Sequence, residues 1–296
     1  MADDQACSCP TGKDDIAGGQ AVIEGVMMRH GSKIATAVRN PQKEIIFQEQ
    51  DYNPISKKIK FFGWPFIRGS VNMVEMLMIG MKTLLFSAEI ALVEEDKKQP
   101  DKWELPLAVL ISFSFTILLF IVLPAFFFSQ LKQFIASTVL LNIVEGCIRL
   151  TIFLAFLSTT LLMEDMRRVF MYHGAEHKTV LAWEDGQELT IENVKPYSTR
   201  HPRCGTSFLL VVMVVSIFVF TFLGRPDFLH RILYKLLLMP LVAGISYEVI
   251  RFTGKHRSNI LVKAISWPGM MMQKITTREP SDDQLEVAIA AMKKVI

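Results

Sequence analysis

Four long apolar segments constrain the fold of this chain more than any other feature of its sequence. They cover residues 105–131, 134–163, 207–223 and 232–250. An α-helix needs about 20 apolar residues to cross a hydrocarbon core roughly 30 Å thick, and these segments meet or approach that length. Hydrophobic residues also make up 51% of the 296 positions, more than soluble domains of this size usually carry. We therefore expect a mostly α-helical membrane protein with about four transmembrane helices.

The lysines and arginines outside these segments are unevenly distributed. The connections at 132–133 and 224–231 carry few of them, whereas residues 97–102, the long connection 164–206 and the residues after 250 carry many. Cytoplasmic loops of membrane proteins hold the excess of positive charge. The distribution predicts a multi-pass protein of the cell (inner or plasma) membrane, with both termini and the 164–206 connection in the cytoplasm. The acidic, polar start of the chain has no signal-peptide pattern.

Composition narrows the classes of partner and compartment. The net charge is +3, and the sequence holds no phosphate-binding glycine loop and no nucleic-acid-binding motif, so we expect no nucleic acid partner. The expected partners are the lipid bilayer and an unknown membrane-associated substrate or protein. The four cysteines are scattered between a polar tail, an apolar segment and a loop. This is not a disulfide framework, and it suits a reducing compartment.

The chain is predicted to form one membrane domain with cytoplasmic segments threaded around it. We expect a disordered tail over 1–16, a cytoplasmic glycine-rich loop and β-hairpin over 17–60, an amphipathic interfacial helix over 61–96, a transmembrane bundle over 97–252 with the cytoplasmic connection 164–206, and a cytoplasmic C-terminal segment over 253–296. The hairpin is expected on either side of the turn-forming pair Asn40-Pro41.

The amphipathic segment carries a charge every seven residues, at Arg68, Glu75, Lys82 and Glu89. This spacing places the four side chains in one polar stripe on a long helix, and leaves Met, Leu, Ile and Phe on the other faces. We expect the helix to lie on the cytoplasmic leaflet. The alternative is a helix inserted into the bundle with its stripe facing other helices.

The sequence His173-x-x-Glu176-His177 is the first candidate for chemistry. On a helix, these three side chains project from one face. Two imidazoles four residues apart can share a metal ion, and the carboxylate between them can bind the metal or act as a base. The order H-x-x-E-H is also the reversed zincin pattern of one class of metallopeptidases. A solvated helix face is the alternative for these five residues taken alone.

His201 and Cys204 form a second pair at the end of the same connection. Pro202 prevents an ordinary helix interior there, and Gly205 permits a tight turn. An imidazole and a thiolate complete a four-ligand set of three histidines and one cysteine, which favours a soft divalent metal, zinc first. The alternative is that both are loop residues packing against the membrane surface.

Two further groups of charged residues lie in or beside the spans. Glu248 ends the fourth span on the cytoplasmic side and is either paired with Arg251, a metal ligand, a partner of an imidazole, or a general base. Glu145 and Arg149 lie four apart in the second span. We expect them to form an intrahelical pair facing the bundle interior, because unpaired charges there would be costly. A structural lock is expected rather than a transport relay, because no other span is expected to carry an acid or base at mid-membrane.

The glycine-rich segment 17–33 surrounds Glu24, Arg29 and His30. Its spacing matches no phosphate-binding loop, so it is expected to be an irregular loop that precedes a strand. His30 is expected to be an exposed turn residue.

Six motifs occur in an order that resembles the YqhQ-like family of bacterial membrane proteins. They are "GGQAVIEGVMMR", "IRGSVNMVEML", "YHGAEHKTV", "HPRCGTSFLL", "AGISYEVIR" and "QKITTREPSDDQLEVAIAAM". The resemblance covers about residues 17–296. It implies a shared fold and supports a metal site, because the family is described only as predicted metal-dependent enzymes. Its polar motif positions fall here on Glu24, Arg29, His173, Glu176, His177, His201, Arg203, Cys204, Glu248, Thr276, Thr277, Arg278 and Glu279.

The leading hypothesis is a zinc-dependent enzyme with its site at the cytoplasmic membrane face. His173, His177, His201 and Cys204 are the expected metal ligands. Glu176 is the expected base, or Glu248 in its place. Hydrolysis of a membrane-associated substrate suits such a site, with Arg29 or Arg278 stabilising an anion.

A different class of function fits the same residues. Four protein ligands close a zinc site and leave no position for a substrate, which is typical of structural zinc. The alternative hypothesis is therefore a non-catalytic scaffold or assembly protein whose zinc holds the 164–206 connection to the bundle. A transporter is disfavoured because few polar residues occur in the spans.

Overall fold

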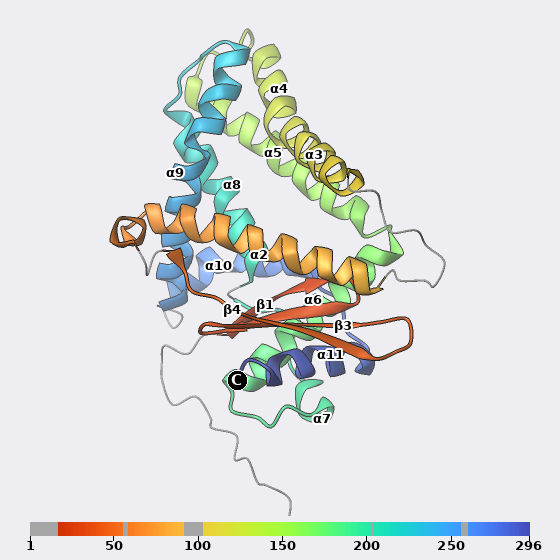
Figure 1. Cartoon of the computed structure of the whole chain (residues 1–296). Coiled ribbons are helices and arrows are strands. Elements are labelled where there is room, and N and C mark those ends of the chain that lie inside the picture. Colours follow the sequence, from red (N-terminus) through yellow and green to blue (C-terminus); the bar gives the residue numbers. More distant parts are fainter. Residues whose placement is uncertain (1–16, 56–58, 92–102, 203, 256–259) are drawn as a thin grey trace, which may run out of the picture.

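The computed structural model describes residues 17–55, 59–91, 103–202, 204–255 and 260–296. The tail predicted for 1–16, residues 92–96 of the predicted amphipathic helix, and Arg203 lie outside the described residues. The described part has a helical bundle at one end and a small sheet flanked by helices at the other (Figure 1).

Four apolar helical stretches build the bundle. The first is α3 (Glu104–Ile117), a π-helical turn (Leu118–Val122) and α4 (Leu123–Leu131); the others are α5 (Thr138–Thr160), α8 (Gly205–Thr221) and α9 (Phe228–Lys255). Within them, Leu107–Leu131, Thr138–Thr160 and Phe228–Thr253 are long and apolar enough to cross a membrane, and α8 is a shorter apolar helix. The predicted fold class, mostly helical with candidate membrane-spanning helices and a small N-terminal β-structure, is confirmed. The third predicted span is the one that falls short in length.

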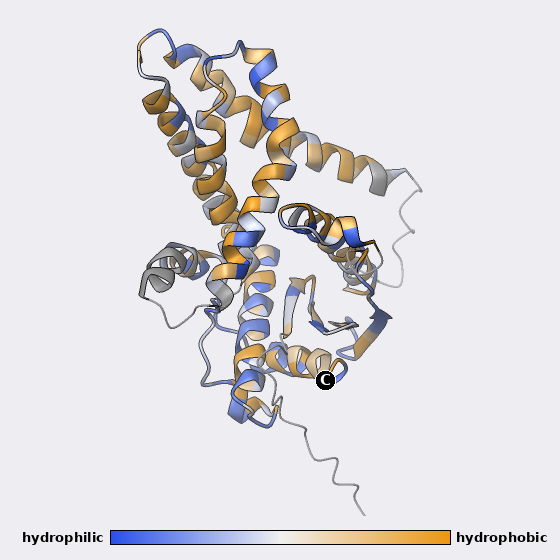
Figure 2. Ribbon diagram, turned by 90° about the vertical axis from the view of Figure 1, so that its left-hand side faces the viewer, coloured by the Kyte–Doolittle hydropathy of each residue, from blue (hydrophilic) through white to orange (hydrophobic). Residues whose placement is uncertain are grey.

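The outer surface of this bundle is apolar. Large side chains such as Leu110, Phe113, Phe218 and Leu237 are more than 60% exposed. Figure 2 shows hydrophobic residues gathered in these helices, whereas hydrophilic residues are frequent in the elements at the opposite end. Such a surface suits hydrocarbon rather than water, as the apolar segments predicted.

The N-terminal sheet has four antiparallel strands in the order β1-β2-β3-β4. They are β1 (Ala17–Val22), β2 (Gly25–His30), β3 (Lys33–Arg39) and β4 (Ile45–Asp51). The predicted hairpin around Asn40-Pro41 is confirmed as β3 and β4. The irregular loop expected over 17–33 was wrong, because this segment forms β1 and β2.

The buried side chains of β2 explain why the glycine-rich segment joins the sheet. Val26 and Met28 are fully buried in a core with Ala35 and Ala37 of β3, so pairing of β2 with β3 removes apolar surface from water. The expectation of an exposed turn residue at His30 was also wrong. Its ring lies at the end of β2 against Trp183, with 5.1 Å between ring centroids.

Helices cover both faces of the sheet. On one face lie α6 (Glu164–Glu184) and α11 (Asp282–Lys293), with the short α7 (Ile191–Val194) beside them, and this side holds the largest core cluster. On the other face lies α2 (Ile67–Ala91), which contacts Met27, Ile34 and Tyr52 of the sheet side through Met76 and Ile79. A 3-10 turn (Lys60–Gly63) precedes α2, and α10 (Ile260–Thr276) packs on α8.

α2 lies across the end of the bundle, between the bundle and the sheet (Figure 1). Half of its polar stripe faces the protein: Arg68 pairs with Glu248 of α9, and the buried Glu75 accepts hydrogen bonds from the Tyr52 hydroxyl and the Ile55 amide, both at 2.8 Å. The other two charges of the stripe, Lys82 and Glu89, are exposed. Burial, and then the hydrogen bond to Glu75, raises the pKa of Tyr52 to about 12, so this hydroxyl remains a donor. Leu77 and Met78 on the outer face are 63% and 59% exposed. An outward apolar face is the arrangement of a helix that contacts lipid.

A buried charge cluster joins α5 to α9 and corrects the expectation of a simple intrahelical pair. Glu145 accepts from Arg149 at 3.0 Å, as predicted, but it also pairs with Arg231 and Lys235 of α9. All four side chains are less than 10% exposed. The expectation that no other span carries such charges was wrong, because α9 begins before the predicted span and includes Arg231, and because Lys235 was overlooked.

Candidate functional site

α6 carries the first group of candidate residues. Glu164 and Asp165 in its first turn favour the helix start, and Gly186 ends it with a φ of +70°, a backbone conformation that glycine adopts without strain. His173 and His177 therefore lie on one helical face, as the spacing predicted, with ring centroids 4.4 Å apart.

Backbone carbonyls orient both imidazoles. The Nδ1 atom of His173 lies 2.9 Å from the Thr276 carbonyl oxygen, and that of His177 lies 2.5 Å from the Thr199 carbonyl oxygen. A carbonyl only accepts hydrogen bonds, so each Nδ1 carries a proton, and in the neutral form of each ring the lone pair is on Nε2. Histidines that bind metals are held in this way.

Cys204 brings a thiol to the same place from the start of α8. Its Sγ lies 3.1 Å from His173 Nε2 and accepts from the Thr206 amide at 3.4 Å, so the side chain caps the helix. Within the described part of the chain, ligand atoms of His173, His177 and Cys204 all lie within 4.8 Å of one another, a grouping that could hold a metal ion.

The chemistry of these three donors fits a metal. His177 is 1% exposed, and its Nε2 has no hydrogen-bond partner among the described residues. A buried acceptor without a partner is costly, and a metal ion would satisfy it. Two imidazoles and a thiolate are typical zinc ligands.

His201 stands apart from this group. Its Nε2 lies 3.7 Å from Glu184 Oε2, and its ring centroid lies 5.7 Å from that of His177. The structure therefore brings together three of the four ligands predicted from the sequence.

Gln273 explains how this segment is held. Its side-chain oxygen accepts from the His201 amide and its nitrogen donates to the His201 carbonyl, both at 2.8 Å, and the residue is fully buried. Gln273 begins one of the six motifs, but its role could not be predicted from the sequence, because an amide side chain is not specific to any kind of site.

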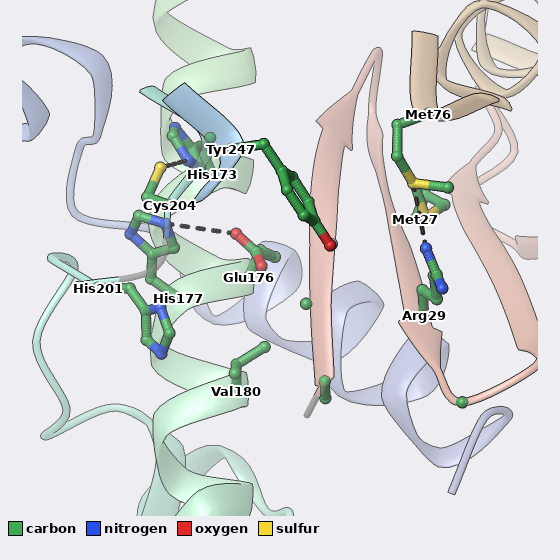
Figure 3. A pocket seen from close by; sticks show the side chains of 15 residues that line it. Met27, Arg29, Met76, His173, Glu176, His177, Val180, His201, Cys204 and Tyr247 are labelled. Atoms are coloured by element: carbon green, nitrogen blue, oxygen red, sulfur yellow. Dashed lines mark hydrogen bonds and ion pairs between the residues drawn. The ribbon is translucent and has the colours of Figure 1, made fainter. Parts of the chain in front are cut away.

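Glu176 lies beside the three donors. Its Oε2 is 3.5 Å from His177 Nε2, and a Cβ placed on Gly19 would lie 3.0 Å from its Cγ. Figure 3 shows the carboxylate between α6 and the sheet, close to His177. It borders a cavity of about 540 Å³ whose walls come from β1, β2, α2, α6, α9 and the start of α8.

Arg29 lines the same cavity from β2. Its guanidinium donates to the Met76 sulfur at 3.2 Å and lies over the Tyr52 ring, 4.3 Å from its centroid. Among the described residues it has no ion-pair partner, unlike Arg39, Arg68 and Arg168, which each hold a glutamate. A guanidinium in that position is available for an anionic group.

The other predicted residues lie elsewhere. Glu248 is held by Arg68 of α2 through two hydrogen bonds of 2.7 and 2.6 Å and does not line the cavity. Arg278 has an exposed side chain outside the lining, and its backbone amide donates to the Phe170 carbonyl at 2.9 Å. Glu24 is bound by Arg168 through two contacts of 2.5 Å at the turn between β1 and β2.

The segment around Arg278 acts through its backbone. Thr276 supplies the carbonyl that orients His173, and Glu279 pairs with the buried Lys178 of α6. The sequence did not predict this role, because backbone carbonyls are common to all residues and leave no pattern of side chains.

The chain matches one protein family and is similar to one curated protein. The model of the family described as "Protein of unknown function (DUF1385)" matches residues 64–296. "Uncharacterized protein YqhQ" of Bacillus subtilis (strain 168) is 34% identical, in an alignment that covers 94% of this chain and 92% of the relative. No solved structure matches the chain.

Proposed function

We propose a function for this chain, which belongs to the DUF1385 family of proteins of unknown function: it is a membrane-bound, zinc-dependent hydrolase. The three long apolar helices and α8 would cross the cell membrane, with both termini and the sheet in the cytoplasm. The substrate would be membrane-associated, because the cavity is bordered by α2 and α9, whose outer faces are apolar.

One observation carries this proposal. His173, His177 and Cys204 direct three donor atoms to one point, and backbone carbonyls hold both imidazoles with Nε2 facing that point. Three protein ligands leave a coordination position open, as catalytic zinc sites do, whereas structural sites use four. The separation of His201 from this group supports catalysis over the scaffold hypothesis.

Each residue has a separate role in this proposal. A divalent metal held by three protein ligands supplies Lewis-acid activation of water and of the substrate oxygen. The Glu176 carboxylate accepts the proton of the attacking water and passes it to the leaving group. Arg29, on the opposite wall, binds a negative group of the substrate. Glu248 serves to hold α2 on α9 through Arg68.

Metal analysis of the purified protein tests the site. We expect about one zinc per chain in the wild type, an unchanged content in Glu176→Gln, and a loss in Cys204→Ala. Replacement of zinc by cobalt would give a sulfur-to-metal charge-transfer band, and the visible bands would shift when a small hydroxamate is added, because a position is open. Exchange of Cys204 for serine would remove the charge-transfer band.

Two results would contradict the proposal. Absence of stoichiometric metal in the wild type would exclude both the enzyme and the zinc scaffold. If the visible spectrum of the cobalt-substituted protein does not change when the hydroxamate is added, the metal site is closed, which would favour the scaffold hypothesis.

A further inference from the structure

The strand β1 forms one edge of the sheet and lies directly beside the candidate metal site. Within the described part of the chain it pairs with β2 alone. Gly18 and Gly19 of this strand line the cavity together with His173, Glu176 and His177. Figure 3 shows the strand between Glu176 on one side and Arg29 on the other.

The pairing register shows which backbone groups of β1 are free. The turn to β2 has two residues, so Val22 and Gly25 face each other as a hydrogen-bonded pair. Such pairs alternate along antiparallel strands, and therefore Ala17, Gly19 and Ala21 direct their N–H and C=O groups away from β2. The free groups of Ala17 and Gly19 belong to residues that line the cavity.

Gly18 leaves this edge of the sheet open. A Cβ on Gly18 would meet no atom within 4 Å, so the strand presents bare backbone to the cavity there. Unpaired edge strands are usually protected by charges, prolines or covering elements. The sequence Ala17-Gly18-Gly19 has none of the first two, and in the described residues the cavity lies where a cover would be.

We propose that the substrate is an extended peptide segment that adds to the sheet along β1. This inference rests on the proposed function, because the metal site and Glu176 would cleave the bound segment. Addition of a strand supplies main-chain hydrogen bonds without requiring a particular sequence. The peptide would belong to a membrane protein, since α2, with its outward apolar face, covers the other face of the same sheet.

The geometry assigns the steps of cleavage. A peptide paired with Gly19 places a backbone carbonyl next to Glu176, whose Cγ lies against that glycine. The water oxygen bonds to the carbonyl carbon, and its proton moves to the Glu176 carboxylate. The C–N bond then breaks, and the proton passes to the leaving nitrogen, so one water is consumed for each bond cleaved.

The Arg29 guanidinium could bind either a carboxylate of a peptide or the phosphate of a lipid headgroup. Its guanidinium lies on the wall beyond β1, where a carboxylate of the peptide would reach it (Figure 3). The open strand edge favours the peptide, because its alternating N–H and C=O groups can all pair with the backbone of an extended peptide, whereas a lipid headgroup lacks such a row of donors and acceptors.

Inhibitor binding to the metal-loaded full chain tests this inference. The probes are acetohydroxamate, a trialanine hydroxamate, and the same trialanine hydroxamate with its amides N-methylated. We expect trialanine hydroxamate to bind about tenfold or more tightly than acetohydroxamate, which corresponds to two or so backbone hydrogen bonds. N-methylation should abolish that gain, because it removes the donors of strand pairing and leaves the metal-binding group unchanged.

Variants of the two sheet edges locate the binding. Ala17→Pro removes an outward N–H from the first residue of β1, where proline is tolerated, and should reduce the gain several-fold. Glu49→Pro makes the corresponding change at an outward position of β4, the far edge, and should leave it unaltered. Acetohydroxamate should bind both variants as it binds the wild type, which shows that each variant is folded and holds its metal.

The outcomes separate this inference from the proposed function. If the wild type has no metal or does not bind acetohydroxamate, the proposed function itself fails. If acetohydroxamate binds and the peptide portion adds no affinity, only the peptide inference is overturned. Competition by dihexanoyl phosphatidic acid without any peptide gain would also overturn it and would identify a lipid phosphate as the ligand.

Discussion

Two backbone carbonyls decide what the imidazoles of α6 can do. Thr199 lies across a loop from α6 and Thr276 lies far from it along the chain, yet the carbonyl of each accepts a hydrogen bond from the Nδ1–H of one histidine. With Nε2 protonated, the same rings would be donors at that atom and could not bind a metal through it. Residues whose side chains look ordinary therefore determine the chemistry of His173 and His177.

Substitution of single histidines distinguishes three ligands from four. His173→Ala should lose most of the bound metal, because it removes one of three converging donors. His201→Ala should retain about one metal per chain, because its ring lies beside Glu184 and outside the group. Metal content after gel filtration is the measurement. Equal loss in both variants would restore the four-ligand set that the sequence predicted.

The helices and strands bring the site together from four parts of the chain. α6 supplies the histidines, the start of α8 supplies Cys204, α10 ends at the carbonyl of Thr276, and β1 closes the cavity. The contact between α6 and the segment after α10 is close: a Cβ on Gly174 would lie 2.1 Å from the Arg278 carbonyl oxygen. Only glycine allows this approach.

Gly174→Ala tests that contact. The methyl group must push the segment after α10 away, which should lower the free energy of unfolding by about 1–3 kcal/mol and weaken metal binding by moving the Thr276 carbonyl. Thermal unfolding in detergent and competition with a chelator measure the two effects. Gly18→Ala is the matched control, since its methyl group meets nothing within 4 Å and should change neither. An equal effect at both positions would contradict the explanation.

In the molecule as a whole, charge is buried where apolar helices meet. Glu145 is the one carboxylate in a described cluster with Arg149, Arg231 and Lys235. The two arginines also donate hydrogen bonds, Arg149 to the Ser216 hydroxyl and Arg231 to the Asn142 side chain. The cluster joins α5 to α8 and α9. Charged groups removed from water remain stable only when they are paired, so these residues link the helices specifically.

A comparison of the stability lost in two variants tests the role of this cluster. Glu145→Gln leaves three cations without a carboxylate and should lower the free energy of unfolding by about 3–5 kcal/mol. Lys235→Met should lower the free energy of unfolding by less, because Glu145 would still be paired with two arginines. Thermal unfolding of both variants in detergent gives the comparison. A larger loss in Lys235→Met would show that the lysine, not the carboxylate, is indispensable.

Labelling of introduced cysteines tests the orientation of the whole chain. In a variant with Cys7 and Cys9 changed to serine, we expect a membrane-impermeant maleimide to label Lys132→Cys on intact cells. Gln187→Cys should react only after the membrane is opened, because it follows α6 on the side with the excess of positive charge. The opposite pattern would place the site outside the cell and contradict the proposed topology.

Local patterns in the sequence were sufficient for several features of this protein. Apolar run lengths predicted the candidate membrane-spanning helices, and the spacing of His173 and His177 predicted a shared helical face. The β3–β4 hairpin followed from its turn residues. These features depend on residues close together in the chain, so periodicity and turn chemistry are enough to identify them.

Long-range packing decided the rest. It placed Cys204 beside His173 and turned His201 toward Glu184, although both lie in one short loop. It also turned Glu75 of α2 toward Tyr52 and made a strand edge out of a glycine-rich segment. No local pattern contains this information, because the partner of each group comes from a distant part of the chain, and only the folded structure brings the two together.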